Sequence, residues 1–526
     1  MAQTGTDSAQ RGILGWVERT GNKLPDPVFI FFYLILALIV ISVIAALAGA
    51  SAVHPTQVDA ETGAPVTITA QSLLAAENIR RLWVEMPATF THFHPLGYVL
   101  VVMLGAGVAE RSGLFGTAMR ASVANAPAML LTPMVALVAM MGNLAADAAY
   151  VVLVPLAGII YAAAGRHPVA GIAAAFAGVS GGFSANLLPG QLDALLFGIT
   201  QEAAQLLDAD WQMNIAGNWF FMAVLLILYI PVIWYVTDRI IEPRLGNYVP
   251  QGEAAMIAGT PDAAAGQGLT PAQRKGLRRG GLAMLAVVAL WAVMALMPGA
   301  PLIDADATPE ARMTPFYQSL VAGFFLLFLA GGWAYGKAAG TIADHRDVVK
   351  MMSGAMGDLA YYLVLAFAAA HFVAMFGWSN LGLIFAIHGA SGLQAVALPT
   401  PVLLLLIVLL TTVLNLFVGS ASAKWALLAP VLVPMLMLLG VSAETTTAAY
   451  RVGDGATNII SPLMVYFPLI LIYCQRWVPS FGLGSLAAMM LPYSLWLLVF
   501  GCALLAGWTL LDLPLGPNAP VHLPGG

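Results

Sequence analysis

Two similar stretches of sequence, GVSGGFSANLLP (Gly178–Pro189) and VGDGATNIISP (Val452–Pro462), decide the fold. Each runs through glycines to a small hydroxyl residue, then to an asparagine, two aliphatic residues and a proline. Each also follows an earlier Asn-Leu pair at the same distance, because 43 residues separate Asn143 from Asn186 and 43 separate Asn415 from Asn458. Polar, helix-breaking stretches that match in two halves of an apolar chain predict a substrate site formed by broken membrane helices.

The composition requires a membrane protein. Of the 526 residues, 60% are hydrophobic and only 9% are charged, and the mean hydropathy is +0.86. Soluble domains carry about 25% charged residues, so this chain could not cover a water-exposed surface. Many apolar runs approach the ~20 residues that a helix needs to cross a bilayer. The two cysteines, Cys474 and Cys502, exclude a disulfide framework and a cysteine metal site.

The basic residues orient the predicted helices. Residues 1–27 form a polar segment with Arg11, Arg19 and Lys23, which we expect in the cytoplasm. The first transmembrane half then covers residues 28–238. A linker at residues 239–279 holds six basic residues, is rich in Gly, Ala and Pro, and is also expected in the cytoplasm.

The apolar segment at about residues 126–164 is interrupted by a polar tip, Gly142–Asp147. Arg120 precedes this segment and Arg166 follows it. If both arginines are cytoplasmic, the segment enters and leaves the membrane on one side, as a re-entrant hairpin whose tip is surrounded by protein or water. Two ordinary spanning helices with a short loop are the alternative, but they would place the linker outside unless another segment is miscounted.

The two halves are predicted to repeat one order of elements. In the first half, the hairpin is followed by a broken helix at about residues 168–200. The second half, residues 280–512, has its hairpin at about 398–439 and its broken helix at about 446–475, and residues 513–526 form an external tail. The fold class is therefore an all-α polytopic membrane protein with nine transmembrane helices and two re-entrant hairpins. The hairpins enter from opposite sides, which makes the halves an inverted repeat.

The asparagines of the repeat are candidates for an ion or ligand site. A helix break leaves backbone groups without partners, and Asn, Ser and Thr side chains can satisfy them. The same oxygens and the free carbonyls can also bind Na⁺. Helix capping alone is the alternative. Candidates for substrate binding or coupling are Asn143, Asn186, Asn415 and Asn458, which are also candidate Na⁺ ligands, with Ser184 and Thr457 beside them.

Charged residues at membrane depth are functional candidates by default, because a charge there costs ~3 kcal/mol on insertion scales. They are Asp147, Asp193, Lys424, Arg451 and Asp454. Arg451 is expected to bind a substrate carboxylate through its two-pronged donor geometry. Asp193 is expected to carry a proton or to contact the substrate.

Three alternatives remain open for the second half. Arg451 and Asp454 are three residues apart, on one helix face, and could pair with each other as structural groups. Lys424 could anchor the hairpin tip by extending to water. Trp425 could stack on an aromatic substrate or simply pack the hairpin.

Other classes of function find little support in the sequence. No nucleophile–base motif stands out, so the protein is not expected to be an enzyme. No phosphate-binding loop is present, so transport would be driven by gradients or exchange. An ion channel is a further alternative, but two mirrored broken helices fit alternating access better.

Three motifs resemble the p-aminobenzoyl-glutamate transporter family (AbgT family): ERTGNKLPDPVFIFF (Glu18–Phe32), GVSGGFSANLLPGQLD (Gly178–Asp193) and YRVGDGATNIISPLMVYFP (Tyr450–Pro468). The resemblance covers nearly the whole chain. It implies a homodimeric transporter of the bacterial inner membrane with nine helices and two hairpins in each protomer. It also implies that Asp193, Trp425 and Arg451 take part in transport.

The function expected from the residues and the resemblance together is secondary active transport of p-aminobenzoyl-glutamate, p-aminobenzoate, related aromatic acids or sulfonamide antimetabolites. We expect the proton gradient to drive it, with export favoured. A sodium-coupled importer of dicarboxylates or other organic anions is the alternative. No cofactor is expected other than H⁺ or Na⁺ as the coupling ion, and the expected partners are the substrate, the lipid bilayer and a second copy of the chain, with no nucleic acid. The N-terminus is expected in the cytoplasm and the C-terminus in the periplasm.

Overall fold

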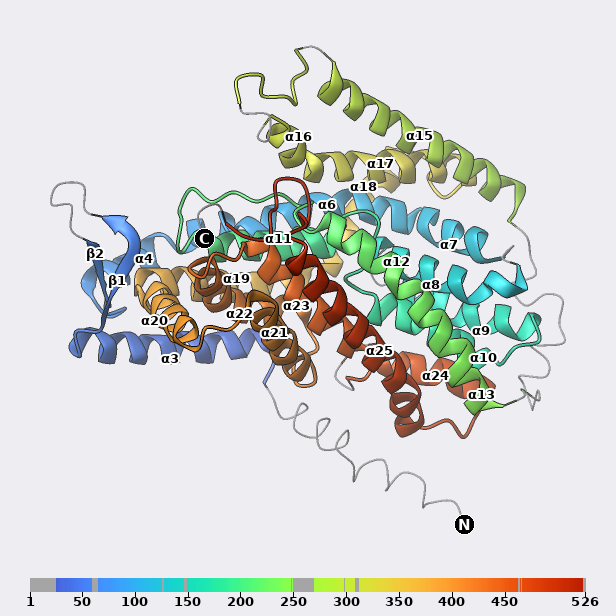
Figure 1. Cartoon of the computed structure of the whole chain (residues 1–526). Helices are drawn as coiled ribbons and strands as arrows, with labels where there is room; N and C mark the ends of the chain where they lie inside the picture. The colour runs from blue at the N-terminus through green and yellow to red at the C-terminus, as the bar shows by residue number, and fades with distance from the viewer. Residues whose placement is uncertain are drawn as a thin grey trace.

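The computed structural model describes residues 25–58, 65–124, 127–145, 149–246, 248, 269–297, 299–307, 312–461, 464 and 466–523. The candidate Asp147, nearly all of the polar N-terminal segment and the middle of the linker lie outside these residues. The described chain is mostly helical, as the sequence predicts. Figure 1 shows α11, α22 and α23 near the centre of the molecule, with the other helices arranged around them.

The chain begins with an apolar helix and a small β-hairpin. Asp26 caps α3 (Pro27–Leu47) by accepting a hydrogen bond from the Val28 amide, and Pro27 occupies the first turn, where a missing N–H costs nothing. An antiparallel pair of strands, which the sequence analysis did not predict, follows α3. The elements that follow α3 are β1 (Ser51–Val58), β2 (Pro65–Thr69), α4 (Ala76–Val84), α5 (Met86–Thr91), α6 (His94–Arg111) and α7 (Leu114–Ala124).

The first predicted hairpin consists of short apolar helices. They are η1 (Ala128–Leu130), α8 (Leu131–Met141), η2 (Gly142–Ala145), η3 (Ala149–Leu153) and α9 (Val154–Ala163). The first broken helix consists of α10 (Pro168–Phe176), the π-helical turn η4 (Ala177–Gly181) and α11 (Gln191–Ala204), with residues 182–190 outside any helix. Glycines and Pro189 occupy the break, which accounts for its position in the chain.

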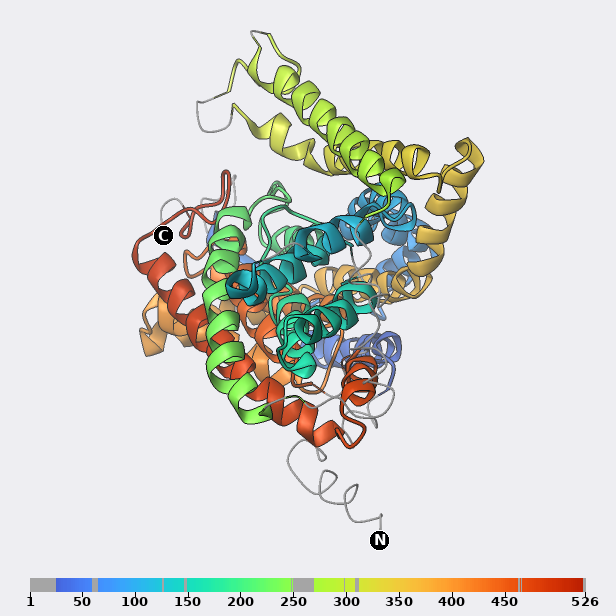
Figure 2. The same cartoon turned by 90° about the vertical axis from the view of Figure 1, so that its right-hand side faces the viewer.

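The middle of the chain forms one long helix and an arm of three helices. The long helix is α12 (Trp219–Tyr235), which continues through η5 (Val236–Ile241) and α13 (Glu242–Leu245). The arm contains α15 (Pro271–Leu296), α16 (Thr314–Gln318) and α17 (Leu320–Ala339). Both views show α15 and α17 side by side, with α15 on the outside and α17 between it and the rest of the molecule, where α17 packs against α6 (Figures 1 and 2). The segment predicted as a linker therefore contains the end of one helix and the start of another.

The second half contains α18 (His345–Asp358), α19 (Ala360–Trp378) and α20 (Leu381–Val396). Its predicted hairpin consists of α21 (Thr400–Asn415) and α22 (Ala421–Met437). Its broken helix consists of α23 (Ala443–Asn458) and α24 (Phe467–Trp477), and α25 (Leu483–Leu510) is the last long helix. The order of hairpin followed by broken helix is therefore the same in both halves.

Six helices of the described chain are long and apolar enough to cross a membrane: α3, α12 with its extension, α15, α17, α19 and α25. A seventh span arises if α6 and α7, bent by 62°, are counted together. The hairpin helices and α10 are apolar but shorter. The apolar stretches of α3 and α15 are only 22% and 11% buried, which fits helices that face lipid.

Glycines of the repeated stretches allow the two halves to meet at their helix breaks. A Cβ on Gly455 would lie 3.1 Å from the Gly181 carbonyl oxygen, so α23 and η4 touch here. A Cβ on Gly453 would lie 1.9 Å from Thr411 Oγ1 and 2.5 Å from the Val408 carbonyl oxygen, so α23 also presses against α21. Any side chain at Gly453 would separate these helices, and the glycine is therefore required for close packing.

Candidate functional site

An ion pair joins the two broken helices. Asp193 lies in the first turn of α11, where its Oδ2 accepts a hydrogen bond of 2.7 Å from the Gly190 amide. A carboxylate at this position is stabilised by the helix N-terminus. Its Oδ1 lies 2.7 Å from Nη2 of Arg451, in the middle of α23, and the two side chains are only 6% and 3% exposed. The structure thus pairs one predicted residue from each half of the chain.

This ion pair engages only one of the three guanidinium nitrogens of Arg451. Arg451 Nε and Nη1 are buried and have no hydrogen-bond partner among the residues that the structure describes. Asp193 Oδ1 also has no well-aligned hydrogen-bond partner among the described residues. Its contact with Nη2 is therefore a close approach of charges rather than a directed bond. Buried donors almost always have partners, and a guanidinium binds a carboxylate best with two parallel N–H groups. Arg451 can therefore accept a second anion.

A second buried ion pair lies at the tip of the second hairpin. Lys424, near the start of α22, contacts both Asp454 Oδ1 and Asn415 Oδ1 through its ammonium group. The Asn415 amide nitrogen lies 2.7 Å from the Asp454 carbonyl oxygen, 2.9 Å from Thr457 Oγ1 and 2.9 Å from Asn458 Oδ1. The lysine and both of its partners, Asp454 and Asn415, are buried, so this cluster ties the hairpin to the broken helix. Five predicted site residues meet here.

An aromatic pair lies next to these charges. The rings of Trp425 and Tyr450 stack with centroids 4.5 Å apart, and Trp425 is completely buried. The Trp425 indole N–H donates to Thr200 Oγ1 of α11 at 2.8 Å. The Tyr450 hydroxyl donates to the Ala421 carbonyl at 2.6 Å and lies 3.3 Å from Asp454 Oδ1. In this conformation Trp425 packs the hairpin against both broken helices and is not open to a ligand.

The geometry decides two alternatives that the sequence left open. Arg451 and Asp454 do not pair with each other, because each has a partner from another element: Asp193 and Lys424. The prediction that Lys424 extends to water is wrong, because its side chain is 2% exposed and bound between two oxygen atoms. Each of the two cations thus has a carboxylate partner, and the charges of the four groups cancel when all are ionised.

The candidate residues of the first half make fewer direct contacts with one another than those of the second half. Asn186 is buried in the helix break, where its Oδ1 accepts a hydrogen bond from the Leu188 amide at 3.4 Å. Asn143 donates to the Met140 carbonyl at 3.0 Å, and within the described chain no hydrogen bond joins it to Asn186. The hydroxyl of Ser184, in the same part of the chain, is buried and has no hydrogen-bond partner among the described residues. The two matched asparagine pairs are therefore not equivalent, since Asn415 and Asn458 are in direct contact.

The sequence analysis missed three polar residues of this region. Thr200 and Tyr450 hold Trp425, and Glu444 in the first turn of α23 is only 3% exposed, with Oε2 unpartnered among the described residues. The signal for Tyr450 was available, because it lies four residues before Asp454 on one helix face. Thr200 gave no signal, because a lone threonine in an apolar helix is common. No group of three or more His, Cys, Asp or Glu side chains that could hold a metal ion occurs in the described residues.

Broken helices, paired hairpins and buried charges that join two repeated halves define a membrane transporter. The chain belongs to the AbgT putative transporter family, whose model matches residues 12–523. It is 37% identical over 512 residues to the p-aminobenzoyl-glutamate transport protein of Escherichia coli strain K12, covering 97% of each chain.

Two solved transporters share the fold. The YdaH transporter of Alcanivorax borkumensis, described as having an unusual topology, superposes with a TM-score of 0.85 at 42% identity, over 94% of this chain and all of YdaH. MtrF of Neisseria gonorrhoeae, placed in a class of antimetabolite efflux pumps, superposes with a TM-score of 0.89 at 41% identity, over 97% of this chain and all of MtrF. The family and these relatives are transporters, which agrees with the prediction that the chain is not an enzyme.

Proposed function

We propose that the protein is a proton-coupled secondary transporter of p-aminobenzoyl-glutamate, p-aminobenzoate and related aromatic acids, and that it also carries sulfonamide antimetabolites. The observation that carries this proposal is the buried Arg451, which touches Asp193 through one nitrogen and has two unpartnered donors within the described chain. A substrate carboxylate would bind Nη2 together with Nε or Nη1 in a bidentate manner, in the place that Asp193 occupies on Nη2. The names of the relatives support the choice of aromatic substrates.

Coupling follows from competition for Arg451. A substrate carboxylate that takes the full guanidinium displaces Asp193, which would leave an uncompensated buried charge. Such a charge costs several kcal/mol, roughly 3–5 in comparable broken pairs. Proton uptake by Asp193 removes this cost. A carboxylate and a proton would therefore bind together and cross the membrane in the same direction.

Substrates without a carboxylate would couple differently. A neutral arylamine, such as a sulfonamide, can donate its N–H groups to the ionised carboxylate of Asp193 but has no anion for Arg451. Because a proton on Asp193 removes its negative charge and weakens this hydrogen bond, proton binding and arylamine binding oppose each other. Exchange results, and an inward proton gradient would drive export. The direction of transport is therefore proposed to depend on the charge of the substrate.

The membrane arrangement belongs to the same proposal. We propose nine spanning helices, two re-entrant hairpins that enter from opposite sides, and a homodimer in the bacterial inner membrane. The N-terminus would lie in the cytoplasm, where the basic residues gather, and the C-terminus would lie in the periplasm. Asn143 and Ser184, beside the first break, would serve as polar substrate contacts.

Sodium coupling to a dicarboxylate is a second candidate function. Asn415, Thr457, Asn458 and Asp454 place several oxygen atoms together, which is the donor set that Na⁺ binds at broken helices. The ammonium group of Lys424 already contacts Asn415 and Asp454 in this cluster. Sodium would have to displace it, so we rank proton coupling first.

Transport into liposomes tests both candidates. Purified protein would be reconstituted, and uptake of labelled p-aminobenzoyl-glutamate would be followed with an imposed proton gradient and then with an imposed sodium gradient. Acid outside should drive accumulation that an uncoupler abolishes, whereas sodium should have no effect. Accumulation that follows sodium alone would replace the first candidate by the second. No accumulation under either gradient would reject both.

A further inference from the structure

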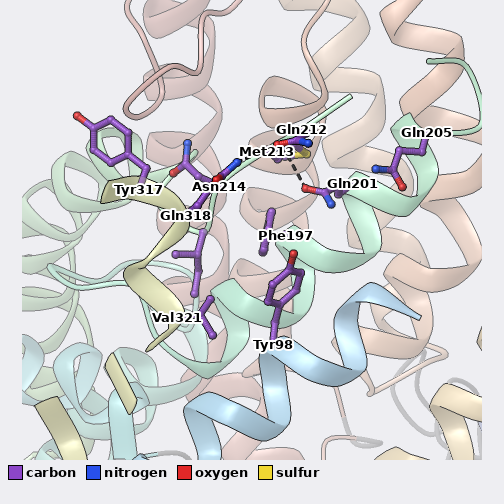
Figure 3. A pocket seen from close by; sticks show the side chains of 11 residues that line it. Tyr98, Phe197, Gln201, Gln205, Gln212, Met213, Asn214, Tyr317, Gln318 and Val321 are labelled. Carbon is purple, nitrogen blue, oxygen red and sulfur yellow. Dashed lines mark hydrogen bonds between the residues drawn. The ribbon is translucent and has the colours of Figure 1, made fainter. Parts of the chain in front are cut away.

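A polar cavity of about 310 Å³ lies at one end of α11. It is enclosed by α6, α11, the chain that follows α11, and the α16–α17 region (Figure 3). Figure 3 shows Tyr98 rising from α6 toward Gln201, while Gln212 and Gln318 approach from the other side. Its volume is at the lower end of the range of small-molecule sites. None of the residues described above as the candidate site lines it.

The cavity lining is polar but carries no charge. No Asp, Glu, Lys, Arg or His occurs among the residues that line it, whereas Gln201, Gln205, Gln212, Asn214 and Gln318 place five side-chain amides there. Each amide offers both N–H donors and a carbonyl acceptor. An amide-rich lining therefore matches a neutral ligand that has its own donors and acceptors, and it offers no cation to pair with a carboxylate.

Hydrogen bonds hold at least three of these amides in place. Asn214 donates to the Pro517 carbonyl at 2.9 Å and accepts from the Ala216 amide at 2.9 Å. Gln201, which is 6% exposed, accepts a hydrogen bond from the Met213 amide at 3.1 Å through Oε1. Gln205 donates to the Trp211 carbonyl at 3.0 Å. The rings of Tyr98 and Phe197 lie beside them with centroids 4.8 Å apart. A preorganised amide set next to aromatic rings is suited to a flat aromatic ligand, because aromatic groups pack well against such rings.

The same helix connects this cavity to the ion pair. Asp193, Phe197, Gln201 and Gln205 follow one another at intervals of four residues, so they lie along one face of α11. Each interval advances about 6 Å along the helix. Asp193 contacts Arg451 at one end of this row, and Phe197 begins the cavity lining about one turn further on.

One exposed hydrogen bond crosses from the α11 side to the arm. Gln318 at the end of α16 donates to Gln212 Oε1 at 2.8 Å, and both side chains are exposed. An exposed neutral hydrogen bond contributes only about 1 kcal/mol, so it would not hold this side closed. A ligand could therefore enter the cavity between α16 and the chain that follows α11.

We propose that this cavity is a second, charge-independent binding site for neutral arylamides: flat aromatic molecules with a primary amine and a carbonyl or sulfonyl oxygen. Its role as an intermediate binding site on the path to Asp193 and Arg451 rests on the proposed transport function. Binding of the arylamide in the cavity does not depend on that function. The two sites divide the recognition of one ligand class. Arg451 selects the carboxylate, and the amide cavity accepts the uncharged remainder.

Equilibrium binding of labelled 4-aminobenzamide to the purified full-length protein tests the proposal. This probe has the arylamine and a carbonyl group but no carboxylate. The wild type should bind it saturably. Val321→Trp fills the cavity from α17 and should weaken binding at least tenfold. Ala322→Trp, at the next and exposed position, is the matched control and should bind as the wild type does.

A second variant protects the test against misfolding. Gln201→Leu keeps the side chain near its size but removes the amide, and it should also weaken binding at least tenfold. Absence of saturable binding to the wild type, or unchanged binding to Gln201→Leu and a folded Val321→Trp, overturns the proposal. The proposed function fails separately, if p-aminobenzoate binding is indifferent to Arg451→Ala while 4-aminobenzamide is still bound.

Discussion

Replacing Arg451 with alanine, alone and together with a substitution of Asp193, separates the effect of the buried ion pair on substrate binding from its effect on stability. The substitution removes the guanidinium and leaves Asp193 without its cationic partner in a site where only 6% of its side chain is exposed. Two effects are expected: the substrate loses its carboxylate partner, and the protein loses the charge that compensates Asp193. A second substitution, Asp193→Asn, relieves only the second effect.

The size of each effect follows from the burial of the pair. Loss of one partner of a buried charge pair at a binding site costs about 2–5 kcal/mol of binding. At 1.4 kcal/mol for each factor of ten, this weakens carboxylate binding by about 30-fold to several thousand-fold. Leaving Asp193 unpaired should lower the free energy of unfolding by about 3–5 kcal/mol.

The assay combines transport with thermal unfolding for four proteins: the wild type, Arg451→Ala, Asp193→Asn and the double variant. Arg451→Ala should lose both transport and stability. The double variant should regain most of the stability but no transport, because no group binds the carboxylate. Asp193→Asn should still bind p-aminobenzoate but should lose its dependence on the proton gradient.

Two results would refute this reasoning. Transport by Arg451→Ala within threefold of the wild type would show that the arginine is only structural. Recovery of transport in the double variant would show that stability, and not carboxylate binding, limits the single variant. Arg451→Lys is the matched control: it keeps the charge, loses the planar pair of donors, and should give an intermediate affinity.

Three further predictions concern the packing around the site. Gly453→Ala should lower the free energy of unfolding by about 1–3 kcal/mol, because its methyl group would collide with α21. Gly507→Ala is the control, because its methyl group would meet no atom within 4 Å. It should be neutral or stabilising in the same thermal unfolding assay. Lys424→Met should cost about 3–5 kcal/mol by leaving Asp454 unpaired, and the double variant with Asp454→Asn should recover most of this loss, so equal melting temperatures of single and double variants would contradict the buried pair. Trp425→Phe keeps an aromatic ring but loses the indole hydrogen bond, which should cost about 1 kcal/mol; a change in melting temperature too small to measure would contradict that bond.

The sequence predicted the helix breaks and hairpins because their signals are local. The predicted second hairpin at about residues 398–439 contains α21 and α22, and the first glycine-rich stretch lies at an interruption between helices. In the second stretch the prediction is only partly right, because Val452–Asn458 belongs to α23 and the interruption begins at Ile459. Hydropathy, glycine and proline act within a few residues of their own position, so they can be read along the chain. The same reading missed the β-hairpin at β1 and β2, because Pro55 interrupts the first strand and the alternation in the second strand covers only five residues.

The candidate residues were also identified by a local argument, since a charge in an apolar segment is costly wherever the segment packs. Their partners were not. Arg451 and Asp454 share a helix face, yet the structure joins Arg451 to Asp193 of α11 and Asp454 to Lys424 of α22. Ion pairing depends on which helices come within a few ångströms of each other, and that distance is not encoded near either residue.

The sequence by itself determined that the chain is a helical membrane protein, where its helices break and which buried charges require partners. Only the tertiary structure decided how those charges pair, that Trp425 is buried against Tyr450, and that an uncharged amide cavity lies on the same face of α11 as Asp193. The physical reason is the distance along the chain over which each effect acts. Hydropathy and helix breaking act over one or two turns, whereas an ion pair or a cavity forms only when distant segments pack together.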